Sequence, residues 1–357
     1  MKRLQEKQIV LFPDFLSRFP STRYQGSKAK LSEWIWGQVA ALDFHSCLDA
    51  FGGTGAVAYR FKKADKQVTY NDLLRFNYYI GVALVENKDT RLSSVEVNWI
   101  LTRHSNIEYP NFVQEHFKNI YFTKSENVWI DQTITNIRQL DDPYKFALAF
   151  FALCQACIVK RPYNLFHRKN LYMRLSDVKR SFGNKASWDR SFDEWFRVFI
   201  DEINQAVFNN GRINRALNFD ALEVPGKYDL VYIDTPYISK GGVGVNYFDF
   251  YHFLEGLTMY DGWLNEIDLK SKHRRLKPRP NAWTDKKQIY IAFDQLFKRY
   301  RDSILVISYR NDGIPSESEL KMLLKKYKSY VRVEHFGQYK YVLSKNGETK
   351  ELLLIGT

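Results

Sequence analysis

The sequence has little that would suit a secreted or membrane protein. It holds only 3 cysteines in 357 residues, too few for a disulfide framework. Its longest apolar run, residues 146–159, is interrupted by Gln155 and falls short of the roughly 20 residues that a membrane-spanning helix needs. No sustained apolar stretch precedes Asp14, so the N-terminus is a poor signal peptide. We therefore expect a soluble, cytoplasmic protein with no membrane segment.

Several catalytic signatures are also absent. The 7 histidines form no HExxH or similar cluster, and we predict no metal site. Cys154 and Cys157 have metal-ligand spacing, but no second pair accompanies them, and they lie in an apolar helical segment. Buried free thiols are the better interpretation.

The charge balance points to a polyanionic partner. Lys and Arg number 53 against 40 Asp and Glu, which gives a net charge of +13. Basic side chains gain most by neutralising phosphates and releasing their counterions. Charge alone does not establish nucleic-acid binding, but it favours it.

Strand-like segments form two groups separated by a long interval. We expect strands at residues 46–51, 67–72, 215–219, 228–234, 303–309, 330–335 and 351–355. The first two are separated by room for one helix, which favours a parallel sheet with right-handed crossovers. Segments 228–234 and 303–309 are nearly continuous apolar runs, as expected of central strands. We expect the last strand to form a hairpin with residues 339–343 across the Asn346-Gly347 turn.

The interval between the two groups looks mainly helical. We predict an inserted helical region over residues 86–205 and an α/β domain formed by residues 1–85 and 206–357. Asp141-Asp142-Pro143 can begin a helix that runs to Lys160, since an acidic cap and an early proline suit a helix N-terminus. A basic stretch over residues 261–285 is expected as an exposed loop, ordered by a partner if at all.

A glycine-rich loop follows the first predicted strand, at Asp49–Val57. Glycines there let the backbone turn sharply and approach a ligand. No lysine follows Gly55, so a Walker loop is excluded, while a dinucleotide fingerprint completed by Ala58 stays open. An S-adenosylmethionine loop also fits, with Asp72 at the end of the next strand to bind ribose hydroxyls. The simplest alternative is an ordinary strand-to-helix corner.

The tetrapeptide Asp234-Thr-Pro-Tyr237 ends the apolar strand at 228–234. Ligands bind at the carboxyl ends of strands in open α/β sheets, so this tetrapeptide and the glycine loop should face one crevice. By itself the tetrapeptide could be an ordinary turn.

Together these motifs resemble the Dam-like, D12 class of adenine-specific DNA methyltransferases. Asp234-Thr-Pro-Tyr237 is a one-residue variant of the Asp-Pro-Pro-Tyr motif of amino-group DNA methyltransferases. Further matches, in chain order, are Tyr24–Lys28, Asp49–Val57, Asn71-Asp72 and Asn218–Asp220. The resemblance implies a Rossmann-like, seven-stranded methyltransferase sheet, S-adenosylmethionine as methyl donor, and N6 of a flipped adenine in double-stranded DNA as acceptor.

The resemblance also assigns residues. Its catalytic set is Asp234, Thr235, Pro236 and Tyr237. Its cofactor-binding set is Tyr24, Lys28, Asp49, Phe51, Gly52, Gly53, Thr54, Gly55, Asp72 and Asp220. Asp234 and a backbone carbonyl would accept hydrogen bonds from the amine, Tyr237 would stack on the base, and Lys28 would pair with the cofactor's carboxylate or approach phosphate. Thr235 stands where the family has proline, which removes rigidity and puts full activity in question.

Two basic segments are candidates for DNA contact. The predicted contacts are Arg161, Asn164, Arg168 and Lys169 in the insertion, and Lys272, Arg274 and Arg275 in the basic stretch. A solvated charged face is the alternative. Aromatic residues within 243–257 fit two roles equally: Tyr247 or Phe250 lining a base pocket, or a core helix.

Rival functions stay open at this point. The same chemistry could act on RNA or on a protein glutamine, although glutamine-modifying relatives tend to carry Asn where this chain has Asp234. Thr235 is the one feature that favours a catalytically silent DNA-binding protein, and a nicotinamide dehydrogenase is a more distant alternative. The recognised DNA site, a companion restriction endonuclease and the oligomeric state are not determined by the sequence.

Overall fold

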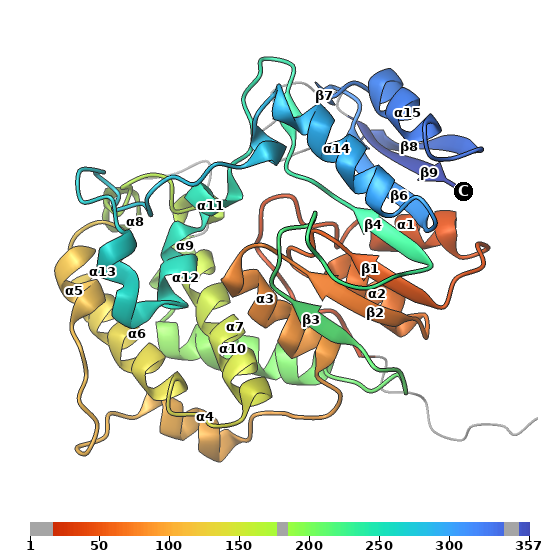
Figure 1. Ribbon diagram of the computed structural model, residues 1–357. Helices are drawn as coiled ribbons and strands as arrows, with labels where there is room; N and C mark the ends of the chain where they lie inside the picture. Colours follow the sequence, from red (N-terminus) through yellow and green to blue (C-terminus); the bar gives the residue numbers. More distant parts are fainter. Residues whose placement is uncertain (1–16, 177–184, 339–349) are drawn as a thin grey trace, which may run out of the picture.

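A seven-stranded sheet forms the centre of the computed structural model, which describes residues 17–176, 185–338 and 350–357 (Figure 1). The strand order is β3-β2-β1-β4-β6-β9-β8. Its strands are β1 (Ser46–Asp49), β2 (Gln67–Asn71), β3 (Arg215–Leu217), β4 (Leu230–Ile233), β6 (Ile304–Arg310), β8 (Val331–Gln338) and β9 (Lys350–Gly356). Neighbouring strands are parallel from β3 to β6, and β9 is antiparallel to both β6 and β8. This confirms the predicted α/β, Rossmann-like fold.

The partner of the last strand differs from the expectation. β9 pairs with β8, which ends at Gln338, and with β6. The predicted partner, residues 339–343, and the Asn346-Gly347 turn lie outside the described residues.

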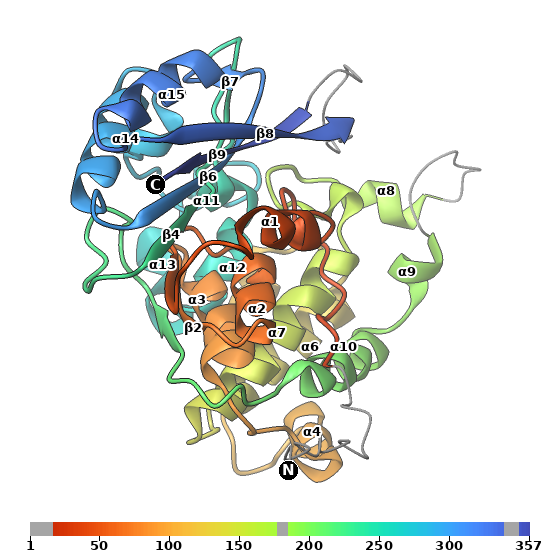
Figure 2. The same cartoon turned by 90° about the vertical axis from the view of Figure 1, so that its right-hand side faces the viewer.

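The central strand β4 is buried on both faces because its side chains alternate between two cores. Leu230 and Tyr232 belong to a core with α1 (Ser32–Val39) and α2 (Ala56–Lys63). Val231 and Ile233 pack instead against α14 (Gln288–Arg299) and α15 (Glu317–Lys325). Figure 2 shows α14 and α15 on one side of β8 and β9 and α1 on the other. The continuous apolar run of β4 thus reflects a three-layer arrangement.

The interval between the strand groups is built from helices. They are α4 (Ser94–Leu101), α5 (Phe112–His116), α6 (Lys124–Ile137), α7 (Pro143–Val159), the 3₁₀ turn η2 (Pro162–Asn164), α8 (Tyr172–Leu175), α9 (Lys185–Asp189) and α10 (Phe192–Ala206). Helix α7 begins as predicted, with the Asp142 carboxylate accepting from the amides of Tyr144 and Lys145. Cys154 and Cys157 are buried within it. The predicted boundaries at 86 and 205 stay a prediction.

The helical region shares the core of the α1 face. Helix α3 (Arg75–Gly81) and the π-helix η1 (Val82–Glu86) follow β2 and pack against α7. Their side chains join one continuous hydrophobic cluster with α7 and α10. Bundle and sheet are therefore held together by apolar burial.

After β4 the chain alternates short elements with turns. These are β5 (Ile238–Ser239), α11 (Tyr247–Phe250), α12 (His252–Leu257), η3 (Tyr260–Gly262), α13 (Trp263–Glu266) and η4 (Ala282–Thr284). The pairing of β5 with β7 (Gly313–Ile314) makes a small antiparallel ribbon that the sequence analysis did not predict. None of the helices in the described part of the chain has both the length and the apolar character that crossing a membrane requires.

Candidate active site

A cleft opens at the carboxyl ends of β1 and β4, where the strand order reverses direction. β1 is flanked by β2 on one side and β4 on the other, and such a reversal is the usual ligand site of an open α/β sheet. The cleft holds about 950 Å³ of empty space, part of it open to solvent. Eleven of the predicted site residues line it: Tyr24, Lys28, Asp49, Phe51, Gly52, Gly53, Thr54, Asp72, Asp220, Asp234 and Pro236. Gly55, Thr235 and Tyr237 lie outside its lining.

The glycine loop is shaped by close contact with Tyr70 of β2. A Cβ atom on Gly52 would lie 2.0 Å from Tyr70 Cε2, so no side chain fits there. Gly53 and Gly55 have φ values of 52° and 75°, a conformation that glycine adopts without strain. Gly55 directly precedes the first residue of α2.

Asp72 holds the glycine loop in position by accepting a hydrogen bond from it. Its two carboxylate oxygens accept from the amides of Gly53 and Leu74, each at 2.8 Å. Burial raises the pKa of Asp72 to about 6, although these hydrogen bonds pull it down. Asn218 donates to the Asp72 carbonyl at 2.7 Å and thereby brings the end of β3 beside the end of β2. This contact positions Asp220, which follows β3, in the cleft lining.

Asp49 is a buried carboxylate in the cleft wall with an unsatisfied oxygen. Its exposed fraction is 1%, and Oδ1 has no hydrogen-bond partner among the described residues. Burial, followed by repulsion from Asp234 and Asp72, raises the pKa of Asp49 to about 8. A buried oxygen left unpaired is destabilising, so its retention in a cleft wall marks a place for a cationic or hydrogen-donating ligand.

The predicted catalytic tetrapeptide directly follows β4, between that strand and the β5–β7 ribbon. Asp234 faces the cleft with a side chain that is 16% exposed. Burial raises the pKa of Asp234 to about 6, Lys28 opposes this rise, and Glu351 adds to it. Thr235 is buried, and its hydroxyl donates to the Pro236 carbonyl at 3.3 Å.

Lys28 and Tyr237 occupy positions that differ from their predicted roles. The Lys28 ammonium is buried and lies 3.1 Å from both Asp234 Oδ1 and Glu351 Oε1, and it donates to the Tyr237 hydroxyl. Burial lowers the pKa of Lys28, but the two carboxylates outweigh it and raise the pKa to about 12. Lys28 is therefore engaged by protein carboxylates rather than free for a cofactor carboxylate or a phosphate.

Tyr237 is held inside the protein by the same groups. It is 4% exposed, its hydroxyl is 2.8 Å from Asp234 Oδ1 and 3.1 Å from Glu351 Oε1, and its ring packs edge-on against Tyr309. Stacking of Tyr237 on a target base, as predicted, would require this arrangement to open.

The aromatic segment after β5 lies partly in the cleft lining and partly in the core. Tyr247 lines the cleft, and its ring stacks on Tyr24 with centroids 5.6 Å apart; Phe248 lines the cleft beside it. Tyr251 stacks on the other side of Tyr24 at 4.5 Å and is buried in the core, where α12 follows. Phe250, the other residue predicted for the pocket, is not part of the cleft lining.

Arg161 does not belong to the surface, contrary to its predicted contact with DNA. It is 1% exposed, and its guanidinium donates to the carbonyls of Leu165, Tyr121 and Arg168 and to Asn170. Burial lowers the pKa of Arg161 to about 9. Arg161 therefore stabilises residues 161–169 from inside the protein through these hydrogen bonds.

The rest of residues 161–169 includes side chains that are exposed to solvent. Arg168 and Lys169 are exposed, and Asn164 is half-buried. Tyr163 is 51% exposed, and both Tyr163 and Asn164 have positive φ, at 63° and 58°. Two consecutive non-glycine residues in this conformation are uncommon and often mark functional loops.

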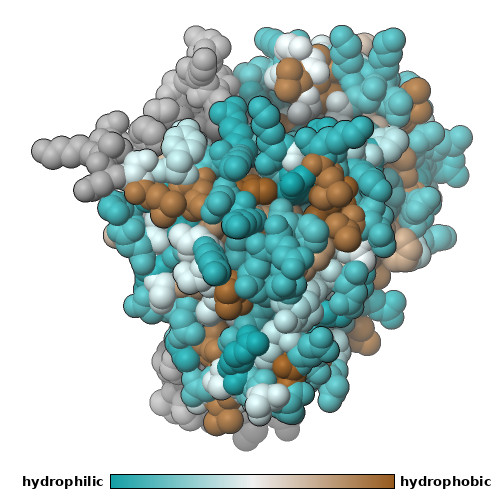
Figure 3. Space-filling view, turned by 90° about the vertical axis from the view of Figure 1, so that its left-hand side faces the viewer, coloured by the Kyte–Doolittle hydropathy of each residue, from teal (hydrophilic) through white to brown (hydrophobic). Residues whose placement is uncertain are grey.

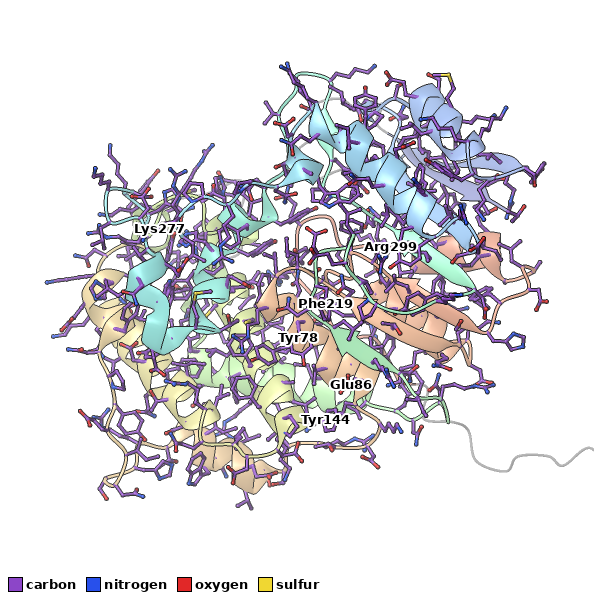
Figure 4. All side chains as sticks on the ribbon, viewed as in Figure 1. Tyr78, Glu86, Tyr144, Phe219, Lys277 and Arg299 are labelled. Carbon is purple, nitrogen blue, oxygen red and sulfur yellow. The ribbon has the colours of Figure 1, made fainter. Side chains whose placement is uncertain are left out.

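The basic stretch lies against this segment. The Tyr121 hydroxyl contacts both the Phe166 carbonyl, at 2.5 Å, and the His273 carbonyl, at 2.7 Å. This contact brings residues 161–169 and 270–279 together although about a hundred residues separate them. The prediction of an exposed loop over residues 261–285 is therefore wrong, because the stretch contains α13 and η4 and buries Trp263, Leu276 and Trp283. Figure 4 shows Lys277 beside α13, far from Arg299, and Figure 3 shows a mainly hydrophilic surface on this side.

The predicted DNA-contact residues of the basic stretch differ in whether their side chains already have partners within the protein. Arg274 donates to the Leu269 carbonyl, and Arg275 lies 3.4 Å from Asp268. Lys272 is exposed. Arg279 reaches toward the cleft, where its guanidinium lies 5.1 Å from the centre of the Phe248 ring.

Glu351 is the main site residue that the sequence analysis missed. A charged residue inside the apolar strand 351–355 was the available signal, because a buried carboxylate needs a partner. The sequence analysis also missed several residues of the cleft lining, among them Asn77, Phe248, Asn281 and Trp283. Phe248 lies within the aromatic segment 243–257 that the sequence singled out, whereas Asn77, Asn281 and Trp283 belong to no recognised motif.

Comparisons with known proteins agree with this geometry. Residues 24–262 match the family described as D12 class N6 adenine-specific DNA methyltransferase. The chain is 31% identical to the type II methyltransferase M2.HphI of Haemophilus parahaemolyticus, over 86% of this chain and 88% of that protein. It is 27% identical to the type II methyltransferase M.FokI of Planomicrobium okeanokoites, over 85% of this chain and 47% of that protein. It is 23% identical to the type II methyltransferase M.NlaIII of Neisseria lactamica, over 87% of this chain and 90% of that protein.

Proposed function

Because the chain belongs to the D12 class of N6 adenine-specific DNA methyltransferases, we propose that the cleft binds S-adenosylmethionine and a flipped adenine side by side, and that Asp234 directs the methyl transfer. The observation that carries this proposal is the position of Asp234 in the same cleft as the glycine loop. The names of the relatives favour a type II modification role beside a restriction endonuclease.

Asp234 is proposed to prepare the amine for attack. An exocyclic amine is a poor nucleophile because its lone pair is delocalised into the ring. When the Asp234 carboxylate and the adjacent backbone carbonyl accept its two N–H groups, the nitrogen can become tetrahedral. The nitrogen lone pair would then form the new N–C bond while the donor's C–S bond breaks and the sulfur keeps that electron pair, and the methylated amine would pass one proton to water. Positioning and electrostatics supply the catalysis.

The cofactor side of the cleft suits S-adenosylmethionine, whose bound form supplies a sulfonium methyl group. Asp49 offers an unpaired buried oxygen to the ammonium of its amino-acid end. Asp72 retains acceptor positions for ribose hydroxyls beyond the two amides that it already binds. Phe51 and Trp283 pack edge-on with ring centroids 5.0 Å apart and add an apolar wall.

The base side of the cleft is proposed to use Tyr247 and Phe248 rather than Tyr237 as aromatic surfaces. Both lie in the cleft lining that Asp234 and Pro236 also form. Aromatic rings support an extruded base by stacking. In this proposal Tyr237 remains hydrogen-bonded to Asp234 and does not stack on the base.

DNA is proposed to lie across residues 161–169 and 270–279. Asn164 and Tyr163 would reach base edges, while Arg168, Lys169 and Lys272 hold phosphates and Arg274 and Arg275 add positive charge. Arg161 is excluded from this set because it is buried. Arg279 connects this surface to the mouth of the cleft through Phe248.

Replacing Arg168, Lys169 and Lys272 together with alanine should weaken DNA binding without unfolding the protein. These side chains are exposed, so their removal takes away little buried structure. The slope of log affinity against log salt should become shallower by about 0.9 for each phosphate that the protein no longer neutralises. Fluorescence anisotropy over a salt series measures it.

A matched triple variant, with Lys298, Arg301 and Lys325 changed to alanine, removes the same charge from exposed positions on or near α14 and α15. An equal weakening of DNA binding in both variants would mean that net charge, and not this surface, governs binding.

Cofactor binding should depend on pH through Asp49. Its pKa of about 8 means that the carboxyl is largely protonated at neutral pH and must ionise to pair with an ammonium. Affinity for S-adenosylhomocysteine should therefore rise with pH up to about 8, then fall at still higher pH as the ligand's own amine loses its charge. Calorimetry in buffers of differing ionisation enthalpy would detect the released proton.

The Asp49→Asn variant separates this effect from others. A raised carboxyl pKa means that the native state binds more protons than the unfolded state between about pH 4 and pH 8, so stability falls as pH rises through that window. The variant should lose the rising limb of affinity and gain in Tm over the wild type, most at pH 8. An unchanged affinity profile would contradict the role of Asp49.

The direct test of the function is methyl transfer itself. Purified protein is incubated with unmethylated duplex DNA and methyl-labelled S-adenosylmethionine, and the DNA is digested to nucleosides that are identified by mass. The expected product is N6-methyldeoxyadenosine at a fixed sequence. Label in RNA or protein, or cofactor and DNA binding without transfer, would instead support the alternatives.

A further inference from the structure

Glu351 is a fully buried carboxylate that lies against the predicted catalytic group. It is 0% exposed, and its Oε1 lies 3.1 Å from Lys28 Nζ and accepts from the hydroxyls of Tyr237, at 3.1 Å, and Ser308, at 2.5 Å. β9 is antiparallel to β6, so its first residues lie at the edge where β4 and β6 end. Topology thus places Glu351 beneath the cleft.

Lys28 and Tyr237 are shared between the carboxylates of Asp234 and Glu351. Lys28 is the one cation shown between two carboxylates, those of Asp234 and Glu351, at distances of 3.1 Å within the described part of the chain. A buried carboxylate that lacked this ammonium would be strongly destabilised, so the lysine is shared. The single Tyr237 proton likewise serves one carboxylate at a time.

Within this cluster Lys28 and Tyr237 use only one of the two carboxylate oxygens of Asp234. Lys28 and Tyr237 both contact its Oδ1, and no donor within the described part of the chain contacts Oδ2. Asp234 lines the cleft, so Oδ2 is the oxygen left for an incoming amine.

We propose that Glu351 is a positioning residue for methyl transfer: by holding Lys28 and Tyr237 on Oδ1 of Asp234, it keeps Oδ2 free to accept the target amine. This inference rests on the proposed function of Asp234. Without the Glu351 charge, Lys28 would have Asp234 as its one anionic partner and would move to contact both oxygens. The carboxylate would then be occupied and weakened as an acceptor.

The Glu351→Gln variant tests this, because it keeps the size of the side chain and removes the charge. The kcat should fall about 10–100-fold, the range typical of removing a supporting group behind a reactive one, with little change in KM. The acidic limb of the kcat profile should move to lower pH, because the Glu351 charge raises the pKa of Asp234. Glu334→Gln on β8 is the matched control, since the Glu334 side chain is 39% exposed and pairs with Arg332.

The outcomes separate positioning from structural support. A lower kcat with an unmoved acidic limb and a lower Tm would mean that Glu351 only stabilises the fold, and the inference would fail. Wild-type kinetics in Glu351→Gln would overturn it while leaving the proposed function intact.

A crystal structure of the variant gives a readout that needs no activity. We expect Lys28 Nζ to leave Tyr237 and contact both oxygens of Asp234. Unchanged positions of Lys28 and Tyr237 would overturn the inference. If the wild type transfers no methyl group, the proposed function fails separately, and this structure still decides whether Glu351 arranges the cluster.

Discussion

Replacing Asp234 with alanine should lower kcat by about a thousandfold or more, equivalent to about 4 kcal/mol of transition-state stabilisation. The variant loses the proposed acceptor of the target amine. Glu351 is buried behind it, and the other carboxylates of the cleft lining, those of Asp49, Asp72 and Asp220, belong to the proposed cofactor-binding set. Single-turnover transfer of labelled methyl groups to DNA measures the decrease.

The fold should survive this change. Lys28 keeps Glu351 as an ion-pair partner at 3.1 Å, so no buried cation is left alone. Melting temperature and S-adenosylhomocysteine binding should stay close to wild type. Asp302→Ala is a suitable control, because that side chain is 92% exposed. Activity of Asp234→Ala within tenfold of the wild type would refute the assignment.

The pH dependence of the wild-type methyl-transfer rate should also reflect the ionisation of Asp234. In the proposed mechanism the Asp234 carboxylate acts in its ionised form, and its pKa is raised to about 6. The rate should therefore fall about tenfold per pH unit below 6 and level off above it.

Replacing Gly52 with alanine should remove cofactor binding and destabilise the protein by about 3 kcal/mol, the upper part of the usual range for overpacking. The new Cβ would lie 2.0 Å from Tyr70 Cε2. That ring cannot yield, because a Cβ at Gly81 would lie 2.2 Å from its other side and its hydroxyl is hydrogen-bonded to the carbonyls of Gly53 and Asn77. The loop must move instead, and it forms the cleft wall. Calorimetric unfolding and S-adenosylhomocysteine titration measure both effects.

Gly37→Ala is the matched control for this prediction. Gly37 lies in α1, and nothing described lies within 4 Å of a Cβ built on it. Alanine there should stabilise the helix by about 0.5–1 kcal/mol. Should Gly52→Ala bind cofactor as tightly as Gly37→Ala, the close packing against Tyr70 would have no functional consequence.

Much of this protein was determined by the sequence alone. The central strands β4 and β6 were predictable because their apolar runs reflect burial on two faces, which is a local pattern. The glycine loop, Asp72 and Asp234 were predictable because each follows a strand directly, and the carboxyl ends of parallel strands meet at one edge.

The contacts behind those motifs were decided by the tertiary structure. Lys28 and Glu351 stand at opposite ends of the chain and meet at Asp234 only because β9 returns antiparallel beside β6. Arg161 looked like a DNA contact in sequence, but the fold buries it.

The proposed DNA surface has the same origin. Residues 161–169 and 270–279 are neighbours because the hydroxyl of Tyr121, buried among both, contacts a carbonyl of each. Periodicity and motif spacing report what a residue does along its own element, whereas the partner of a buried charge is set by packing between elements. For this reason the sequence predicted the cleft and its chemistry, and only the fold showed how Lys28, Tyr237 and Glu351 are arranged around the reacting carboxylate.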